Sequence, residues 1–372
     1  MKKVLIIGAG WAGASCSSYL EENSIETTLI EQKNVVGGHS RSEVKSGVIY
    51  EPNGPHIFHT SNAEVNNFVR KFGMKRKFKH KVKSRIYPPS LKGDSALVSW
   101  PPQVNEIKKF QEWINIEKEL MNLPKKPIDN NFETYAISIM GKTLYELFIY
   151  GYTKKQWDLE PNELSSRFAP KRIDLRTDNE LGLFKDKWEY FHAKGSGDII
   201  ENILINKDVH FDLKVDINNI SNLIKDYTHV VITSALDDFI ASDQKLEWRG
   251  IKSKTKLYED LDESECITEA YQINHPSLEE NYTRTIETKH ASGQRVKASI
   301  VQEEYAYPNI RHYPVYRSGT NVFDDNDKFK NQIVNEISRP VYFAGRLANY
   351  KYINQDEAIL DGFRTARKIL KA

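Results

Sequence analysis

The sequence KVLIIGAGWAGASCSSYLEENSIETTLIE, residues 3–31, has the pattern of a strand, a glycine-rich turn, a helix and a second strand. Its first apolar run is typical of a strand buried on both faces of a parallel sheet. Gly8, Gly10 and Gly13 permit a tight turn that brings backbone amides close to a pyrophosphate at the helix N-terminus. Glu31 ends the second strand, where a carboxylate accepts hydrogen bonds from a ribose 2′-hydroxyl. These residues predict a dinucleotide-binding unit of the Rossmann type.

A second glycine-rich segment, GGHSR at residues 37–41, follows soon after Glu31. Gly38 lets the backbone pass close to a bound cofactor, and Arg41 is placed to meet a phosphate. A glycine pair at this position is more typical of FAD-binding proteins than of NAD-binding ones. We therefore expect FAD as the cofactor, although the same pair in isolation would be an ordinary loop.

The composition indicates a folded protein without a general attraction for polyanions. Of its 372 residues 39% are apolar and 28% charged, which suits two or three domains. The 53 lysines and arginines nearly balance 51 acidic residues, which argues against a nucleic-acid partner. The chain has only two cysteines, Cys16 and Cys266, and no apolar run of the roughly 20 residues that span a membrane. We predict a cytoplasmic protein with no metal site and no membrane span.

Periodicity in the sequence predicts further helices and strands. Helical spacing of apolar residues marks the segments 11–20, 62–71, 104–121, 132–149 and 357–370. Strand patterns mark 27–30, 228–234, 282–287, 296–303, 310–315 and 340–344.

The fold class we expect is α/β, with a Rossmann-type FAD-binding domain, an inserted helical domain and an antiparallel β-sheet domain. The expected FAD-binding domain is discontinuous and comprises residues 1–78, 186–243 and 317–372. The helical domain is expected at 79–150, and the substrate-binding sheet domain at 151–185 and 244–316.

Three motifs farther along the chain carry a family resemblance. They are NGPHIFHT at 53–60, GYTKKQW at 151–157 and GRLANYKY at 345–352. Each resembles the corresponding segment of the UDP-galactopyranose mutases, and the third is similar almost residue for residue. Shorter matches are KRIDLR at 171–176, YTR at 282–284 and YPV at 313–315. The resemblance covers essentially the whole chain.

The resemblance and the glycine turns together indicate which residues bind the cofactor. These are Gly8, Gly10, Gly13, Glu31, Gly38, His39, Arg41, His56, Arg346 and Asn354. In the family, the HIFHT segment lies beside the flavin ring and the arginine of the GRLA segment lies against it. His56 and His59 could alternatively be core histidines or a metal pair, although no third ligand with suitable spacing accompanies them.

The same resemblance indicates the substrate-binding residues Tyr152, Trp157, Arg172, Trp188, Arg284, Tyr313 and Tyr352. It implies that Tyr152 stacks on the base and that Trp157 lines the sugar site, whereas from the sequence alone Trp157 is equally typical of a core residue. It also implies that Arg172 and Arg284 clamp the diphosphate, because a guanidinium can hold phosphate oxygens bidentately. Without the resemblance, either arginine would be interpreted as a solvated surface group. The expected catalytic residues are Arg172, Arg284 and His59.

The resemblance implies a homodimeric, flavin-dependent isomerase that interconverts an NDP-hexopyranose and its furanose for cell-surface polysaccharide synthesis. The family works through a sugar adduct on N5 of the reduced flavin, so NAD(P)H or another reductant is needed. UDP-galactopyranose is the expected substrate.

Departures from the family pattern at Trp100, Trp188, His312 and Asn354 leave the sugar and the base open. The alternatives are UDP-N-acetylgalactosamine and a TDP-6-deoxyhexose. A second hypothesis is an FAD-dependent oxidoreductase of the amine-oxidase type, which shares the N-terminal fingerprint. A third is a substrate-binding homologue without turnover.

Overall fold

A parallel sheet brings the two ends and the middle of the chain together. The computed structural model describes residues 2–168, 173–308 and 310–372. The strand order is β16-β10-β1-β2-β9, and every neighbouring pair is parallel. The strands are β1 (Lys3–Ile7), β2 (Glu26–Ile30), β9 (Asp208–His210), β10 (His229–Ile232) and β16 (Val341–Phe343). Because β1 pairs with β2 on one side and β10 on the other, the order reverses at β1, where open α/β sheets bind ligands.

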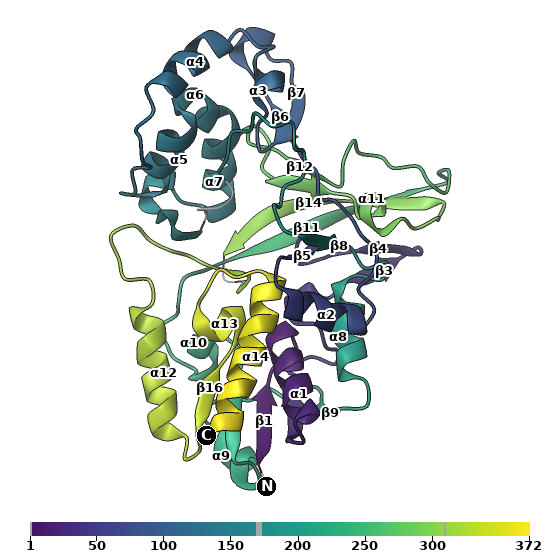
Figure 1. Ribbon diagram of the computed structural model, residues 1–372, viewed down its shortest axis with the longest axis vertical. Helices are drawn as coiled ribbons and strands as arrows, with labels where there is room; N and C mark the ends of the chain where they lie inside the picture. Colours follow the sequence, from purple (N-terminus) through teal and green to yellow (C-terminus); the bar gives the residue numbers. More distant parts are fainter. Residues whose placement is uncertain (1, 169–172, 309) are drawn as a thin grey trace.

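Helices cover both faces of this sheet, as Figure 1 shows. One face packs against α1 (Trp11–Glu22), α2 (Ala63–Lys71), α8 (Ser196–Leu204) and α14 (Gln355–Lys371). The other packs against α9 (Ile220–Leu223), α10 (Leu236–Phe239) and α12 (Asp324–Glu336). Helices α1 and α14 are very close, since a Cβ added to Gly362 would lie 2.1 Å from the Ser15 hydroxyl oxygen. The predicted Rossmann-type unit is confirmed.

An antiparallel sheet lies between this unit and the helices at the other end of the molecule (Figure 1). Its order is β15-β11-β14-β13-β12-β6-β7, with a single parallel pairing, between β12 and β6. The strands are β6 (Val82–Ile86), β7 (Ala96–Trp100), β11 (Trp248–Glu259), β12 (Gln272–Asn274), β13 (Arg284–Ile286), β14 (Ala298–Pro308) and β15 (Tyr313–Pro314). We expected residues 82–100 in the helical domain, but the alternating burial of β6 fits a strand with one buried face.

The helical part comprises α3 (Val104–Ile107), α4 (Trp113–Met121), α5 (Phe132–Met140), α6 (Lys142–Tyr145), a π-helical turn at Glu146–Tyr150 and α7 (Gly151–Trp157). The helix expected at 104–121 is therefore two helices. The helix expected at 132–149 breaks at Gly141, whose φ of +80° lies outside the helical region. Helix α7 packs in the same apolar core, although we expected residues 151–157 in the sheet domain.

Short elements join these parts. They are β3 (Glu43–Lys45), β4 (Val48–Tyr50), β5 (Phe58–Thr60), β8 (Trp188–Tyr190), α11 (Lys289–Ser292) and α13 (Gly345–Asn349). None of the described helices is both long and apolar enough to cross a membrane.

Candidate active site

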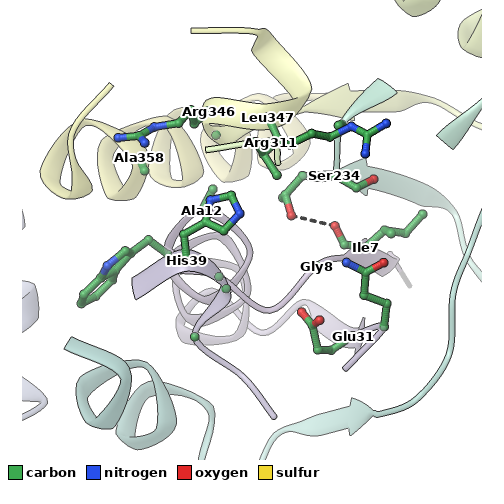
Figure 2. Close-up of a pocket in the computed structure, with 18 of the residues that line it drawn as sticks. Ile7, Gly8, Ala12, Glu31, His39, Ser234, Arg311, Arg346, Leu347 and Ala358 are labelled. Carbon is green, nitrogen blue, oxygen red and sulfur yellow. Dashed lines mark hydrogen bonds between the residues drawn. The ribbon is translucent and has the colours of Figure 1, made fainter. Parts of the chain in front are cut away.

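A cavity of about 470 Å³ opens at the carboxyl ends of β1, β2 and β10, at the point where the strand order reverses. Figure 2 shows Arg346 and Leu347, from the C-terminal segment, across the cavity from Gly8 and Glu31 of the first unit. The sequence-predicted residues that line it are Gly8, Gly10, Glu31, Gly38, His39, His56, Arg346 and Asn354. Segments far apart in the sequence therefore form one ligand-sized cavity.

The two glycine turns shape one end of this cavity. Gly8 has a φ of +105°, which L side chains rarely adopt. A Cβ on Gly38 would lie 3.4 Å from the Cα of Gly10, so the two turns lie against each other. A Cβ on Gly13 would lie 2.0 Å from the Gly8 carbonyl oxygen. Gly13 thus allows α1 to start close to the turn. It is not among the residues that line the cavity.

Glu31 follows β2, and two backbone amides of the neighbouring turns fix its carboxylate. Its Oε2 accepts a hydrogen bond from the Ala9 N–H at 3.0 Å, and its Oε1 accepts one from the Lys33 N–H at 3.0 Å. The residue is buried and lines the cavity. Because two amides fix the carboxylate, its remaining lone pairs are oriented for a ligand hydroxyl.

At the other end, the partly buried His39 and His56 and the buried His312 cluster with Arg346. The His39 and His312 rings contact edge to face at 4.6 Å. Burial lowers the pKa of His56 to about 3 and that of His312 to about 4, with the Arg346 charge adding to both effects. Burial likewise holds the pKa of His39 well below 6.5. All three imidazoles are therefore neutral at physiological pH, and Arg346 supplies the positive charge.

Arg346 is anchored on backbone carbonyls between two cavities. Its Nη1 donates to the His312 carbonyl at 2.9 Å and its Nε to the Ile353 carbonyl at 3.1 Å. Its guanidinium carbon lies 5.3 Å from the ring centroid of Tyr313 and 5.4 Å from that of Tyr352. These two rings stack on each other at 5.3 Å. Arg346 lines the large cavity and both tyrosines line a second one, so the three residues form a shared wall.

The second cavity is smaller, about 140 Å³, and seven of its fifteen lining residues are aromatic. The sequence-predicted residues that line it are Tyr152, Trp157, Arg284, Tyr313 and Tyr352. The Arg284 side chain is 12% exposed and is paired through its Nε with the fully buried Glu304 of β14. Flat aromatic faces beside a partly buried cation suit a ligand with a ring and an anionic group.

Lys155 joins the two elements that carry these residues. Its Nζ lies 2.5 to 2.8 Å from the carbonyl oxygens of His275, Ser277, Glu280 and Tyr282, which share the three N–H donors of the ammonium. The lysine thereby ties α7, with Tyr152 and Trp157, to the loop that leads into Arg284. Burial lowers the pKa of Lys155 to about 8.

Besides Gly13, three sequence-predicted site residues among those described line neither cavity. His59 hydrogen-bonds Asp186 through Nδ1 at 2.7 Å and stacks on Phe184. Trp188 pairs with Thr60 across β5 and β8 and packs against the core. Arg41 follows the second glycine turn without reaching the lining. Arg172 falls outside the described residues.

Cys266, Glu287 and His290 form one group whose ligand atoms are close enough to hold a metal ion. The oxygens of Glu287 already accept hydrogen bonds from Ile267, Thr268 and Ser299. Burial raises the pKa of Cys266 to about 11, so its thiol is protonated at neutral pH. We assign this group a structural role.

Sequence reasoning missed several lining residues. Thr233 and Ser234 follow β10 and line the large cavity, as do Lys33 and Arg311. The first two could have been found, because β10 was expected to rejoin the sheet and ligands bind at strand carboxyl ends. Gln156, Gln272 and Asn274, which line the small cavity, carried no such signal.

Comparison with known proteins decides the family. The family model described as UDP-galactopyranose mutase matches residues 147–352, more than half of the chain. This chain belongs to the UDP-galactopyranose mutase family. A model described as an NAD(P)-binding Rossmann-like domain matches residues 6–72.

Two curated relatives align with the whole of this mutase-family chain. A dTDP-fucopyranose mutase of Escherichia coli is 29% identical over 390 residues, covering 100% of this chain and 99% of that protein. A probable UDP-galactopyranose mutase of Klebsiella pneumoniae is 26% identical over 385 residues, covering 100% and 95%. The crystal structure of a reduced UDP-galactopyranose mutase superposes with a TM-score of 0.75 at 15% identity, covering 100% of this chain and 94% of that one.

Membership of the family makes the chain an isomerase that acts on a nucleotide sugar and implies a flavin cofactor. The matched region, 147–352, lies beyond the N-terminal fingerprint shared with flavin oxidoreductases. The prediction of a mutase is therefore confirmed, in preference to the hypothesis of an amine-oxidase-type oxidoreductase.

Proposed function

We propose that the protein interconverts an NDP-hexopyranose and its furanose, with FAD in the large cavity and the nucleotide sugar in the small one. The shared wall of Arg346, Tyr313 and Tyr352 carries this proposal, because it places a dinucleotide-type site directly beside an aromatic site. A reaction between a cofactor and a sugar needs that adjacency.

The large cavity fits FAD. Its volume of about 470 Å³ is within the range of cofactor sites, and the glycine turns leave the backbone accessible to a diphosphate. Glu31 would accept the adenosine ribose hydroxyls. Arg346 and the neutral His39 and His56 would face the isoalloxazine, with Asn354 nearby. When bound and reduced, the flavin supplies the nucleophile for the anomeric carbon.

The residues of the small cavity would bind and orient the substrate. Arg284 would hold the diphosphate as it leaves and returns, helped by the hydroxyls of Tyr313 and Tyr352. Tyr152 would stack on the base and Trp157 on the sugar. Because Glu304 holds the Nε side of Arg284, the guanidinium is oriented before substrate arrives.

Four residues stay in the proposal on the evidence of the sequence: Arg172, His59, Trp188 and Arg41. Arg172 would be the second diphosphate clamp and Arg41 a phosphate ligand. His59 would support the cofactor-facing segment through its bond to Asp186. Trp188 would reach the substrate only after a rearrangement of β8.

UDP-galactopyranose is the substrate we propose first, and a dTDP-6-deoxyhexose such as dTDP-fucopyranose is the second candidate. The second is supported by the full-length similarity to a dTDP-fucopyranose mutase. It is also supported by the apolar lining of Trp100, Phe132 and Phe148, with the Trp100 and Phe148 rings 5.9 Å apart. Apolar surface of this kind suits the methyl group that distinguishes thymine from uracil.

We further propose a cytoplasmic homodimer that contributes to cell-surface polysaccharide synthesis and is kept reduced by NAD(P)H or a similar donor. Support comes from the family resemblance, and from two cysteines that are both free, as a reducing compartment favours. Light scattering after gel filtration tests the dimer: a mass of about twice 43.0 kDa is expected, and 43.0 kDa would contradict it.

The substrate assignment is tested with the dithionite-reduced protein and a panel of UDP-galactofuranose, UDP-N-acetylgalactofuranosamine and dTDP-fucofuranose. Chromatography follows the pyranose product. Arg284→Ala is the test variant, and Arg295→Ala is the matched control because Arg295 is exposed and, among the described residues, forms an ion pair only with Glu263. Conversion by the wild type and the control, but not by Arg284→Ala, is expected. Equal conversion by all three proteins would contradict the clamp.

A further inference from the structure

Glu51 is a buried acid that none of the proposed roles uses. It follows β4 and is 1% exposed. Gln302 of β14 fixes its backbone on both sides, since the Glu51 N–H donates to Gln302 Oε1 at 3.2 Å and Gln302 Nε2 donates to the Glu51 carbonyl at 3.0 Å. The side chain is therefore held in the interior and not at the surface.

The two oxygens of the Glu51 carboxyl group have unequal surroundings. Oε2 accepts hydrogen bonds from the His56 N–H at 2.8 Å and from the Tyr271 hydroxyl at 2.9 Å. Oε1 is buried and has no hydrogen-bond partner among the described residues. A buried polar atom without a partner calls for a physical explanation.

Glu304 is already one buried anion in this region, and no neighbouring cation in the described part of the chain remains to neutralise Glu51 as a second. Among the described residues, Glu304 from β14, Tyr271 and His56 interact with it, and the Arg284 charge acts on Tyr271 and His56. The Arg284 charge is already paired with Glu304. Among the described residues no lysine or arginine forms an ion pair with Glu51, and His56 is neutral. A carboxylic acid buried without a cation retains its proton.

The neighbour of the unpartnered oxygen is a cofactor-site histidine. Glu51 Oε1 lies 3.9 Å from His56 Nδ1, which is also buried and has no partner among the described residues. His56 lines the large cavity. A small rotation of the ring would close the gap to a hydrogen bond, and such bonds are often long before a ligand binds.

We propose that Glu51 is a neutral carboxylic acid that donates its Oε1 proton to His56 Nδ1 and thereby fixes His56 with its own proton on Nε2. A neutral imidazole carries one proton, so an acceptor role at Nδ1 makes Nε2 a donor. Glu51 is thus a positioning residue: it makes His56 present an N–H to the cavity. Burial, with the Glu304 charge adding to it, raises the pKa of Glu51 to about 7, which agrees with this state.

The protonation state of Glu51 and the tautomer of His56 are properties of the folded chain, and only their meaning for the cofactor rests on the proposed function. The experiment therefore reads them spectroscopically in the purified, cofactor-loaded protein. Infrared difference spectra between pH 5 and pH 9 report the carbonyl band of a protonated acid. Nitrogen-15 correlation spectra of labelled histidines report which ring nitrogen carries the proton.

The test variant is Glu51→Gln, whose amide can still donate to Nδ1, and the matched control is Glu43→Gln. Glu43 is also a tyrosine-bonded glutamate, with Tyr50 as its partner on the neighbouring hairpin. We expect an acid band that disappears with a midpoint near pH 7, is absent in Glu51→Gln and is unchanged in Glu43→Gln. The His56 Nε2–H signal should persist in both variants.

An acid band unaffected by Glu51→Gln, or a wild-type His56 protonated on Nδ1 at pH 6, would overturn the proposal. If Glu51→Gln does not fold, Glu51→Asp serves instead. Its shorter acid should retain the band but lose the fixed His56 tautomer, and an unchanged tautomer would overturn the proposal equally well.

Discussion

The buried acid Glu51 makes the stability of this protein depend on pH in a predictable window. Its pKa is raised from 4.5 to about 7 in the folded chain by burial. Between these values the folded state holds a proton that the unfolded state has lost, so the free energy of unfolding falls as pH rises. At about 1.4 kcal/mol per pH unit, the loss reaches about 3 kcal/mol above pH 7. Below pH 4.5 the contribution of Glu51 is fully retained.

Glu51→Gln removes this titration, because an amide has no proton to lose in that range. Between pH 5 and pH 8, the free energy of unfolding of the variant should therefore rise by about 2.5 kcal/mol relative to that of the wild type. Urea unfolding at both pH values, with FAD at the same excess, measures the difference, and Glu43→Gln serves as the control that should gain little. A difference between variant and wild type that stays constant across the window would refute the assignment of a raised pKa.

Three further substitutions test the cofactor and substrate sites. Glu31→Ala strands the Ala9 and Lys33 amides, so FAD should bind at least about tenfold more weakly in a fluorescence titration, and unchanged affinity would exclude the ribose role. Lys155→Met should raise KM about tenfold with kcat nearly unchanged, because four carbonyls lose their donor while the flavin site is untouched; equal losses in both constants would point to general misfolding. Arg284→Ala should lower kcat/KM by about a hundredfold or more while the protein still purifies yellow, and a variant of normal activity would show that another group holds the diphosphate.

The sequence predicted the parts of this fold that depend on short patterns. The strand, glycine turn and helix at residues 3–22 repeat known geometry, so β1, α1 and the position of Glu31 followed directly. The strands β10 and β16 were found because continuous apolar runs are typical of a doubly covered parallel sheet.

Elements that depend on long-range contacts were less accessible. Strand β11 went unpredicted, since its lysines at 252, 254 and 256 conceal the strand pattern and its pairing with β14 is remote in sequence. The break at Gly141 depends on a positive φ that a helical apolar pattern does not reveal. The β6–β7 pair was placed in the helical domain because its partner β12 lies far along the chain.

The residues of the candidate site also divide into those that short motifs predict and those that depend on long-range contacts. Motif residues such as Gly10, Tyr152 and Arg346 line the two cavities. Trp188 does not line either described cavity, because β8 pairs with β5 and turns its ring toward the core. The link between Lys155 and the 275–282 loop can be seen only in the folded structure. The same is true of the burial of Glu51 without an ion-pairing lysine or arginine among the described residues.

A count of turnovers per reducing equivalent shows whether the protein isomerises a nucleotide sugar without net oxidation. The protein is reduced anaerobically with one equivalent of dithionite per flavin and mixed with an excess of the preferred NDP-hexofuranose. The flavin absorbance and the pyranose product are followed together. We expect many pyranose molecules per flavin while the flavin stays reduced. Product limited to one molecule per flavin, formed as the flavin reoxidises, would contradict it.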